Sequence, residues 1–338
     1  MIDELKYNFI LCFSEEYYSV MFDDKDESDY YGFIEYPVVN SFFKKLCFSR
    51  KIPRIVRYPV YLIFSYKLIR MIRYKVKKMK YPDRPICFIT HRDHVGMIKK
   101  GLYNRIKKCF PGSKVIIVVT DIITPGSLLE KLVNHEEKNQ YVDMIYSFNP
   151  LEAKKYDLYL CNVPASDFSG GYLSSEIKYD VIFIGKIKDR KDMVIRTWNS
   201  FTKRGLRCAF FLNEVNENEK NDFPSGVIFS DWMSYQEYLK KTAESRIILE
   251  ISQGGSTGNT LRVNEAVILG KKLISDNTAL KDNPSYDPGN MFVFDEPDEI
   301  PDDFLFGNTK DYSTDIKEKI SFHHFFEQID NDISNKLL

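Results

Sequence analysis

The chain has 338 residues, of which 43% are hydrophobic and 28% charged, a composition typical of a soluble globular protein with room for two domains. No apolar run reaches the length of a membrane span, and no signal-peptide pattern opens the chain. Six cysteines stand without C-x-x-C spacing, which indicates neither zinc nor a disulfide framework. Reduced thiols in a cytoplasmic compartment are the simplest interpretation.

The 48 basic and 48 acidic residues cancel, but they are unevenly distributed. Residues 1–40 carry ten acidic residues and two lysines, whereas residues 41–80 carry thirteen Lys or Arg and no Asp or Glu. The basic segment 41–80 predicts, after Pro59, a helix with an apolar face and a basic face. The basic face is either only solvated or lies on an anionic membrane surface. Because no nucleic-acid-binding signature accompanies it, we expect no nucleic acid partner.

Short apolar strands alternate with helices along most of the chain. Strands are predicted at residues 7–13, 86–90, 114–120, 142–146 and 158–161. A polar, glycine-bearing stretch at 164–178 suits a linker. The alternation then restarts, with strands at 179–184, 206–212, 226–230, 247–251 and 272–275. This arrangement predicts an α/β protein with two Rossmann-like, doubly wound domains, residues 1–165 and 166–338.

The most informative stretch is 246–275, which predicts a strand, a loop of small residues, a helix and a second strand. Such a loop presents backbone N–H groups and a positive dipole end to an anion. On the helix, Arg262 would hold a phosphate by its fork of donors, and Glu265 would accept hydrogen bonds from a ribose. An ordinary glycine turn with a surface ion pair explains the same residues. The loop residues are Gln253, Gly254, Gly255, Ser256, Thr257, Gly258 and Thr260.

The sequence NTLRVNEAVILGKKLIS resembles the donor-site segment of bacterial GT-B glycosyltransferases, of the kind that acts in lipopolysaccharide and capsular polysaccharide synthesis. The resemblance implies that the two domains face a cleft, the first binding an acceptor and the second a nucleotide sugar. Thr257 stands where many retaining members carry a second Glu, so the stereochemistry of transfer is left undetermined. The matching residues are Gly258, Thr260, Arg262, Glu265, Ala266, Gly270 and 271–275.

A second candidate loop, IGKIKDRK at residues 184–191, follows the first strand of the second half. Gly185 permits close approach, and Lys186, Lys188 and Arg190 supply positive charge to grip a diphosphate. A solvated basic turn is the alternative. Basic residues and a helix dipole would stabilise the leaving diphosphate, so we expect neither a metal nor another cofactor.

A third candidate, THRDHVG at residues 90–96, follows a predicted strand at the edge where open α/β sheets bind ligands. An acceptor hydroxyl is a poor nucleophile, so an inverting transfer needs a general base, usually His or Asp. We expect His91, Asp93 or His94 to be catalytic. Capping of the following helix explains Asp93 equally well.

The resemblance therefore implies a hexosyltransferase-type enzyme that moves a sugar from a nucleotide sugar to a glycan or lipid-linked acceptor in cell-surface polysaccharide synthesis. It would work in the cytoplasm, peripherally at the inner face of the cell membrane. Two alternatives remain open: a non-catalytic glycan- or lipid-binding partner of a polysaccharide assembly complex, and a sugar-nucleotide epimerase or phosphorylase on the same fold.

Overall fold

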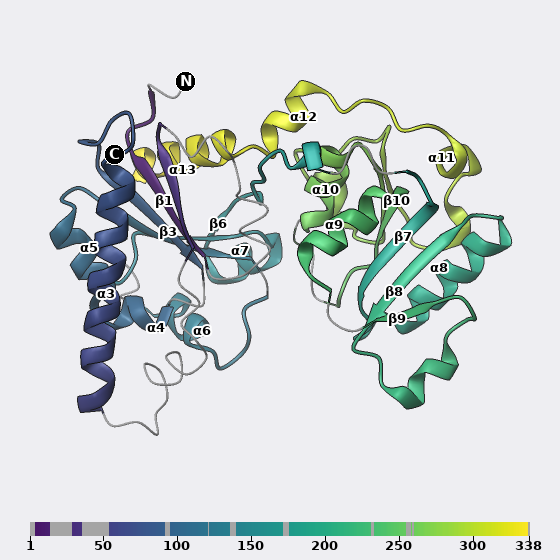
Figure 1. Ribbon diagram of the computed structural model, residues 1–338, viewed down its shortest axis with the longest axis horizontal. Coiled ribbons are helices and arrows are strands. Elements are labelled where there is room, and N and C mark those ends of the chain that lie inside the picture. Colours follow the sequence, from purple (N-terminus) through teal and green to yellow (C-terminus); the bar gives the residue numbers. More distant parts are fainter. Residues whose placement is uncertain are drawn as a thin grey trace. The chain divides into compact units, whose positions relative to one another are not determined.

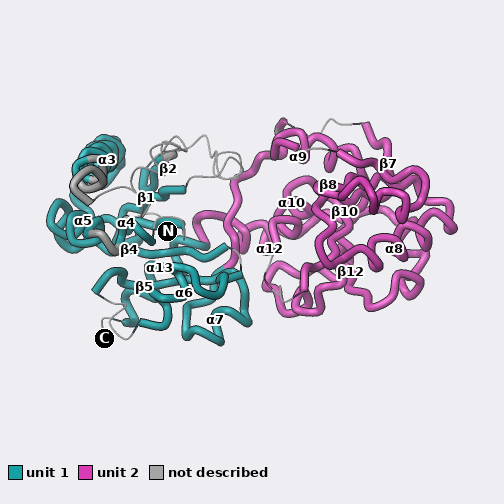
Figure 2. Tube along the Cα trace, turned by 90° about the horizontal axis from the view of Figure 1, so that it is seen from below, with its two compact units in different colours: residues 1–161, 325–338 teal, residues 162–324 magenta. Residues whose placement is uncertain are grey.

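The computed structural model describes residues 4–13, 29–35, 54–91, 95–120, 122–135, 140–171, 176–230, 233–254, 258 and 260–336. The chain forms two compact units, unit 1 of residues 1–161 with 325–338 and unit 2 of residues 162–324 (Figure 2). Each unit contains a six-stranded parallel sheet with helices packed on it (Figure 1). The predicted α/β fold with two doubly wound sheets is confirmed.

In unit 1 the strand order is β2-β1-β3-β4-β5-β6. The first strand, β1, pairs with both β2 and β3, so the order reverses between β1 and β3. The strands are β1 Asn8–Phe13, β2 Tyr31–Glu35, β3 Ile86–His91, β4 Lys114–Val119, β5 Met144–Ser147 and β6 Tyr159–Leu160. The helices are α3 Arg54–Val76, α4 Val95–Met97, α5 Tyr103–Cys109, α6 Leu128–Val133, α7 Pro150–Tyr156 and α13 Phe322–Lys336.

The two faces of the unit 1 sheet are covered by helices from distant parts of the sequence. On one face Ile10 of β1 belongs to the same buried cluster as Ile72 of α3. On the other, Phe9 stacks on Phe326 of α13 with ring centroids 4.3 Å apart. Successive strand residues point to opposite faces, so this second apolar face needs its own cover. The end of the chain provides it, and unit 1 therefore includes residues that the sequence assigned to a second domain of 166–338.

Two helices of unit 1 differ from their predicted form. The chain from α4 to α5 is not one continuous helix, because Gly101 between them has φ 104°. Glycine adopts this left-handed conformation without strain, so the chain kinks there. The basic helix α3 begins at Arg54 and contains Pro59 within it, so it starts before the proline that was expected to precede it.

In unit 2 the strand order is β12-β11-β10-β7-β8-β9. The chain builds outward from β7 to β9 and then crosses to the other side of β7, so the order reverses between β7 and β10. The strands are β7 Tyr179–Lys186, β8 Cys208–Asn213, β9 Ile228–Ser230, β10 Ser245–Glu250, β11 Lys272–Ser275 and β12 Met291–Val293. The α-helices are α8 Lys191–Lys203, α9 Tyr235–Ala243, α10 Leu261–Leu269, α11 Asp302–Phe306 and α12 Thr314–Lys319.

Helices cover both faces of the unit 2 sheet as well. Phe183 of β7 and Trp198 of α8 lie in one buried cluster, and Ile248 of β10 and Val263 of α10 lie in another. Ligands of open α/β sheets bind outside the carboxyl ends of the strands where the order reverses, which here means the ends of β7 and β10. Among the described residues, no helix combines the length and the apolar composition that crossing a bilayer requires.

Candidate functional site

The two loops predicted from the second half of the sequence meet at the carboxyl ends of β7 and β10. The Lys188 ammonium donates a hydrogen bond to the Gln253 side-chain oxygen at 2.6 Å, and the Gly254 N–H donates to the Asp189 carboxylate at 2.9 Å. A Cβ at position 254 would lie 2.5 Å from that carboxylate oxygen and would displace it. Asp189 thus joins the loops, and the α8 N-cap is Arg190, which makes no side-chain cap bond.

Two arginines lie beside the backbone of Gly185 at this edge. A Cβ on Gly185 would lie 3.2 Å from Arg190 Nη2 and 3.7 Å from Arg262 Nη2. Arg190 donates to the carbonyl oxygen of Ile251 at 2.6 Å and also to that of Lys186. Arg262 donates to the carbonyl oxygen of Ile184 at 2.7 Å. Backbone carbonyls therefore hold both guanidiniums, and within the described part of the chain neither of them forms an ion pair with a carboxylate.

The two arginines differ in their electrostatic surroundings. Burial lowers the pKa of Arg262, but the nearby Tyr238, Glu250 and Glu265 outweigh it, so that this pKa is raised. Burial, followed by the nearby charge of Arg262, lowers the pKa of Arg190 to about 10, against smaller opposing effects of Asp189, Asp276 and Glu250. The buried Arg190 Nε–H has no hydrogen-bond partner among the residues that the structure describes. Both guanidiniums stay protonated at neutral pH. A phosphate at this edge would relieve their repulsion and accept the unused donors.

The two predicted lysines of the β7 loop are already engaged. Lys186 forms an exposed ion pair with Glu214 at 2.5 Å, and Lys188 bonds to Gln253. The backbones of Lys188 and Glu214 have φ of 45° and 57°, a left-handed conformation that costs energy for residues with a side chain. Of the three basic residues predicted to grip a diphosphate, only Arg190 lies with Arg262 beside Gly185.

A buried carboxylate that the sequence did not single out anchors the start of α10. Glu250, 2% exposed at the end of β10, accepts hydrogen bonds from the hydroxyls of Thr260 and Ser275, the latter at 2.6 Å. Thr260 is the N-cap of α10, and its side chain also accepts from the Arg262 N–H at 3.3 Å. The Gly258 carbonyl accepts from Asn277 Nδ2 at 3.4 Å. Glu250 thus ties the positive end of α10 to the sheet.

Glu265 is enclosed by two tyrosines of α9. Its carboxylate accepts a hydrogen bond from Tyr235 at 2.9 Å on one oxygen and one from Tyr238 on the other. The two phenol rings are stacked, with centroids 5.6 Å apart. Burial raises the pKa of Glu265, against the opposing effects of Arg262 and the phenols. Because the side chain is only 2% exposed, contact with a ribose would require the tyrosines to share or release it, and that contact stays a prediction.

The remaining predicted site residues lie elsewhere or outside the described residues. Asp93 and His94, and likewise the loop residues Gly255, Ser256 and Thr257, are not among the described residues. His91 ends β3, beside the point where the strand order of unit 1 reverses. It is fully buried, and its Nε2 lies 2.9 Å from the Thr120 hydroxyl. His91 is thus at the expected edge of the sheet, but its imidazole does not face solvent.

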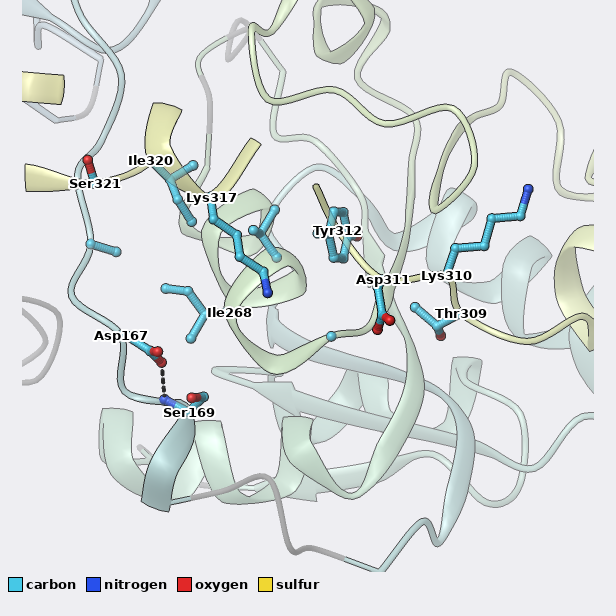
Figure 3. Close-up of a pocket in the computed structure, with 13 residues that line it drawn as sticks. Asp167, Ser169, Ile268, Thr309, Lys310, Asp311, Tyr312, Lys317, Ile320 and Ser321 are labelled. Carbon is cyan, nitrogen blue, oxygen red and sulfur yellow. Dashed lines mark hydrogen bonds between the residues drawn. The ribbon is translucent and has the colours of Figure 1, made fainter. Parts of the chain in front are cut away.

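A cavity of about 390 Å³ lies at the opposite end of α10, near Gly270 (Figure 3). Its lining mixes the carboxylate of Asp167, which accepts a hydrogen bond from the Ser169 N–H at 2.9 Å, with the lysine side chain of Lys317 and apolar Ile268. The cavity is separate from the arginine pair. It lies near Gly270 at the C-terminal end of α10, whereas Arg262 lies in the first turn of that helix. Among the described residues, no group of three or more His, Cys, Asp or Glu side chains could hold a metal ion.

Comparison with known proteins identifies the fold. No protein-family model matches the chain, and no curated protein matches it. Solved structures do match: Anabaena HepE in complex with UDP and glucose has a TM-score of 0.54, 10% identity, and covers 97% of this chain and 99% of its own. An alpha-glucosyltransferase in complex with UDP and a 13-mer DNA has a TM-score of 0.51, 14% identity, and the same coverage. The fold is GT-B.

The same comparison corrects one expectation. We excluded nucleic acid as a partner because the sequence carries no RNA- or DNA-binding signature. That exclusion was wrong, since a structure of this fold holds a 13-mer DNA together with UDP. Phosphate contacts need only placed cations and hydroxyls, so they leave no short motif in a sequence.

Proposed function

We propose that the protein is a glycosyltransferase that binds a nucleotide sugar at the carboxyl edge of the unit 2 sheet. The observation that carries this proposal is the arginine pair: Arg190 and Arg262 flank Gly185, held by backbone carbonyls. A nucleoside diphosphate has the charge and the oxygen acceptors that this arrangement lacks. UDP is the first nucleotide to test, because both structures named above contain it.

The residues of this edge would stabilise the leaving group. Transfer breaks the bond between the anomeric carbon and the diphosphate oxygen and forms a bond to an acceptor oxygen. Negative charge then collects on the diphosphate, beside Arg190, Arg262 and the N-terminus of α10. Lys186 and Lys188 would join the grip by releasing Glu214 and Gln253, and Gly254 would offer its N–H to the diphosphate by releasing Asp189. Glu265 would accept hydrogen bonds from the ribose hydroxyls in place of those that Tyr235 and Tyr238 donate to it.

We further propose that unit 1 holds the acceptor. The acceptor hydroxyl must lose a proton as its oxygen bonds to the sugar, and His91, Asp93 and His94 are the candidates to accept it. The proposed acceptor is a glycan or lipid-linked saccharide of cell-surface polysaccharide synthesis, and the donor carries a hexosyl group. The resemblance of residues 258–275 to enzymes of that pathway supports this. The proposed location is the cytoplasm, peripherally at the inner face of the cell membrane.

Calorimetric titration with UDP tests the donor site. Arg262→Ala removes one charge-assisted contact, worth about 1.5–3 kcal/mol, so Kd should rise about tenfold to a hundredfold. Arg262→Lys keeps the charge but loses the planar fork, and should recover only part of the affinity. Arg196→Ala is the matched control, because Arg196 lies on α8 and pairs with Glu296, away from the site. Unchanged UDP affinity in both Arg262 variants would overturn the proposed donor site.

A product assay then separates the function classes that share this site. Release of UDP from UDP-sugar with sugar on an acceptor supports transfer. UDP binding with neither transfer nor hydrolysis would favour the non-catalytic partner of an assembly complex. Interconversion of the donor sugar without release of UDP would favour an epimerase.

A further inference from the structure

Helix α3 has one face in the core of unit 1 and one face toward solvent. Leu68, Ile72 and Val76 belong to the unit 1 core and are at most 8% exposed. The opposite side carries residues spaced three or four apart, which therefore form a single stripe along the helix. Figure 1 shows α3 as a long helix that packs along unit 1. This stripe is not needed for the fold and was not used by the proposed activity.

The stripe exposes large apolar side chains. Ile63, Tyr66 and Tyr74 are 71%, 69% and 59% exposed, the three highest values among the large hydrophobic residues whose burial is described. Isolated exposed apolar residues need no explanation, but a row of three on one helix face does. Tyrosine in such a position suits a boundary between water and an apolar phase, since its ring and its hydroxyl prefer different sides.

The stripe also carries cations without counterions. Its exposed basic residues form no ion pair with any carboxylate of the described residues, and residues 41–80 contain no Asp or Glu. Two of them lie near aromatic rings instead: Lys78 Nζ is 4.3 Å from the centroid of Tyr74, and the Arg73 guanidinium is 6.0 Å from that of Phe110. These basic residues are Lys67, Arg70 and Arg73 of α3 and Lys77 and Lys78 of the turn that follows it.

We propose that this α3 stripe is a docking surface for an anionic lipid bilayer. The helix is about 34 Å long at 1.5 Å per residue, so it can lie flat in the headgroup region. Ile63 and Tyr66 would enter the acyl boundary, and the cations further along would meet lipid phosphates. The apolar end decides between a bilayer and a nucleic acid. An exposed isoleucine beside a tyrosine gains little from a phosphate backbone and much from an acyl boundary.

Vesicle sedimentation of the full chain tests the proposal. It needs no sugar donor, so its result does not depend on the proposed glycosyltransferase activity. The wild type should pellet with phosphatidylcholine vesicles that contain phosphatidylglycerol at low salt, and be released at high salt. Gln at all five basic positions should lower the partition coefficient by at least about a hundredfold, from about fivefold per charge. Ile63→Ser with Tyr66→Ser should lower it even at low salt, where the charges are intact.

The matched control removes five exposed lysines elsewhere, Lys154, Lys155, Lys203, Lys240 and Lys281, by the same change to Gln. It alters net charge equally and should keep binding to within a few fold, and circular dichroism confirms that each variant is folded. Equal binding to vesicles of phosphatidylcholine alone, or equal loss in the control, would overturn the proposal. So would a stripe variant that loses affinity for a DNA oligonucleotide while still pelleting with anionic vesicles, because the stripe would then be a nucleic-acid surface.

Discussion

In both sheets the strand order reverses beside the first strand, β1 in unit 1 and β7 in unit 2, but the chemistry at that edge differs. In unit 2, β7 ends beside two guanidiniums and a glycine, and β10 ends in a buried carboxylate that anchors a helix N-terminus. In unit 1, hydroxyl and imidazole groups lie at the described ends of β1 and β3: the Thr90 hydroxyl donates to the Cys12 carbonyl at 3.1 Å, and His91 Nε2 lies 2.9 Å from the Thr120 hydroxyl. Among the described residues, the unit 2 edge thus carries two guanidiniums, whereas the unit 1 edge carries hydroxyl and imidazole groups.

The largest effect on the unit 2 edge is expected from Glu250→Ala. The hydroxyls of Thr260 and Ser275 would lose their buried acceptor, and each such loss costs about 1–3 kcal/mol. The free energy of unfolding, measured by urea titration, should fall by about 3 kcal/mol. UDP affinity should fall as well, because the N-terminus of α10 is no longer held. Glu250→Gln keeps one acceptor and should lose less of both; equal losses in the two variants would argue against this anchoring role.

A smaller effect, and one that depends on pH, is expected from Glu265→Gln. Burial raises the pKa of Glu265 in the folded state, so the folded chain binds more protons than the unfolded one between the two pKa values. Ionisation of Glu265 therefore lowers stability as pH rises above its unfolded pKa, about 4.3. The variant should flatten that decline in urea titrations across the pH range. An identical pH dependence of the unfolding free energy in wild type and variant would contradict the raised pKa of Glu265.

The smallest effect on UDP affinity is expected from His91→Ala, which changes the unit 1 edge alone. If the two edges have separate roles, UDP should bind the variant as it binds the wild type, while sugar transfer to an acceptor falls by about a hundredfold or more, the range of general base catalysis. Thr120→Val removes the His91 partner without removing the imidazole and serves as the comparison. A large loss of UDP affinity in His91→Ala would mean that the edges are not independent.

Local signals in the sequence predicted much of the fold and part of the site. The predicted order of strand, loop, helix and strand over residues 246–275 is correct, because caps such as Thr260 and Gly270 act within one turn of the helix they end. Short strands with weak patterns were missed: β2, Tyr31–Glu35, follows an acidic stretch, and β12, Met291–Val293, has three residues. Both are held by pairing with a neighbouring strand, which a single sequence does not display.

Contacts between distant residues account for what the sequence could not indicate about the site. Asp189 lies just before α8, yet it accepts a hydrogen bond from Gly254, 65 residues away. The two tyrosines that enclose Glu265 lie 30 and 27 residues before it. Arg190 and Arg262 were each predicted as phosphate ligands, and only the strand order brings both to Gly185.

The return of α13 to unit 1 has a consequence for how the chain folds during synthesis. Phe9 cannot stack on Phe326, and the Tyr146 hydroxyl cannot donate to Asp332, until α13 has been made. That face of the first sheet stays uncovered until then. At ribosomal rates of about 5–20 residues per second, the interval after residue 161 lasts about ten to thirty seconds. Unit 2 is one continuous stretch that ends at residue 324, immediately before the residues that cover this face. The half that is made first is therefore finished last, and until then its open apolar face is a target for chaperones.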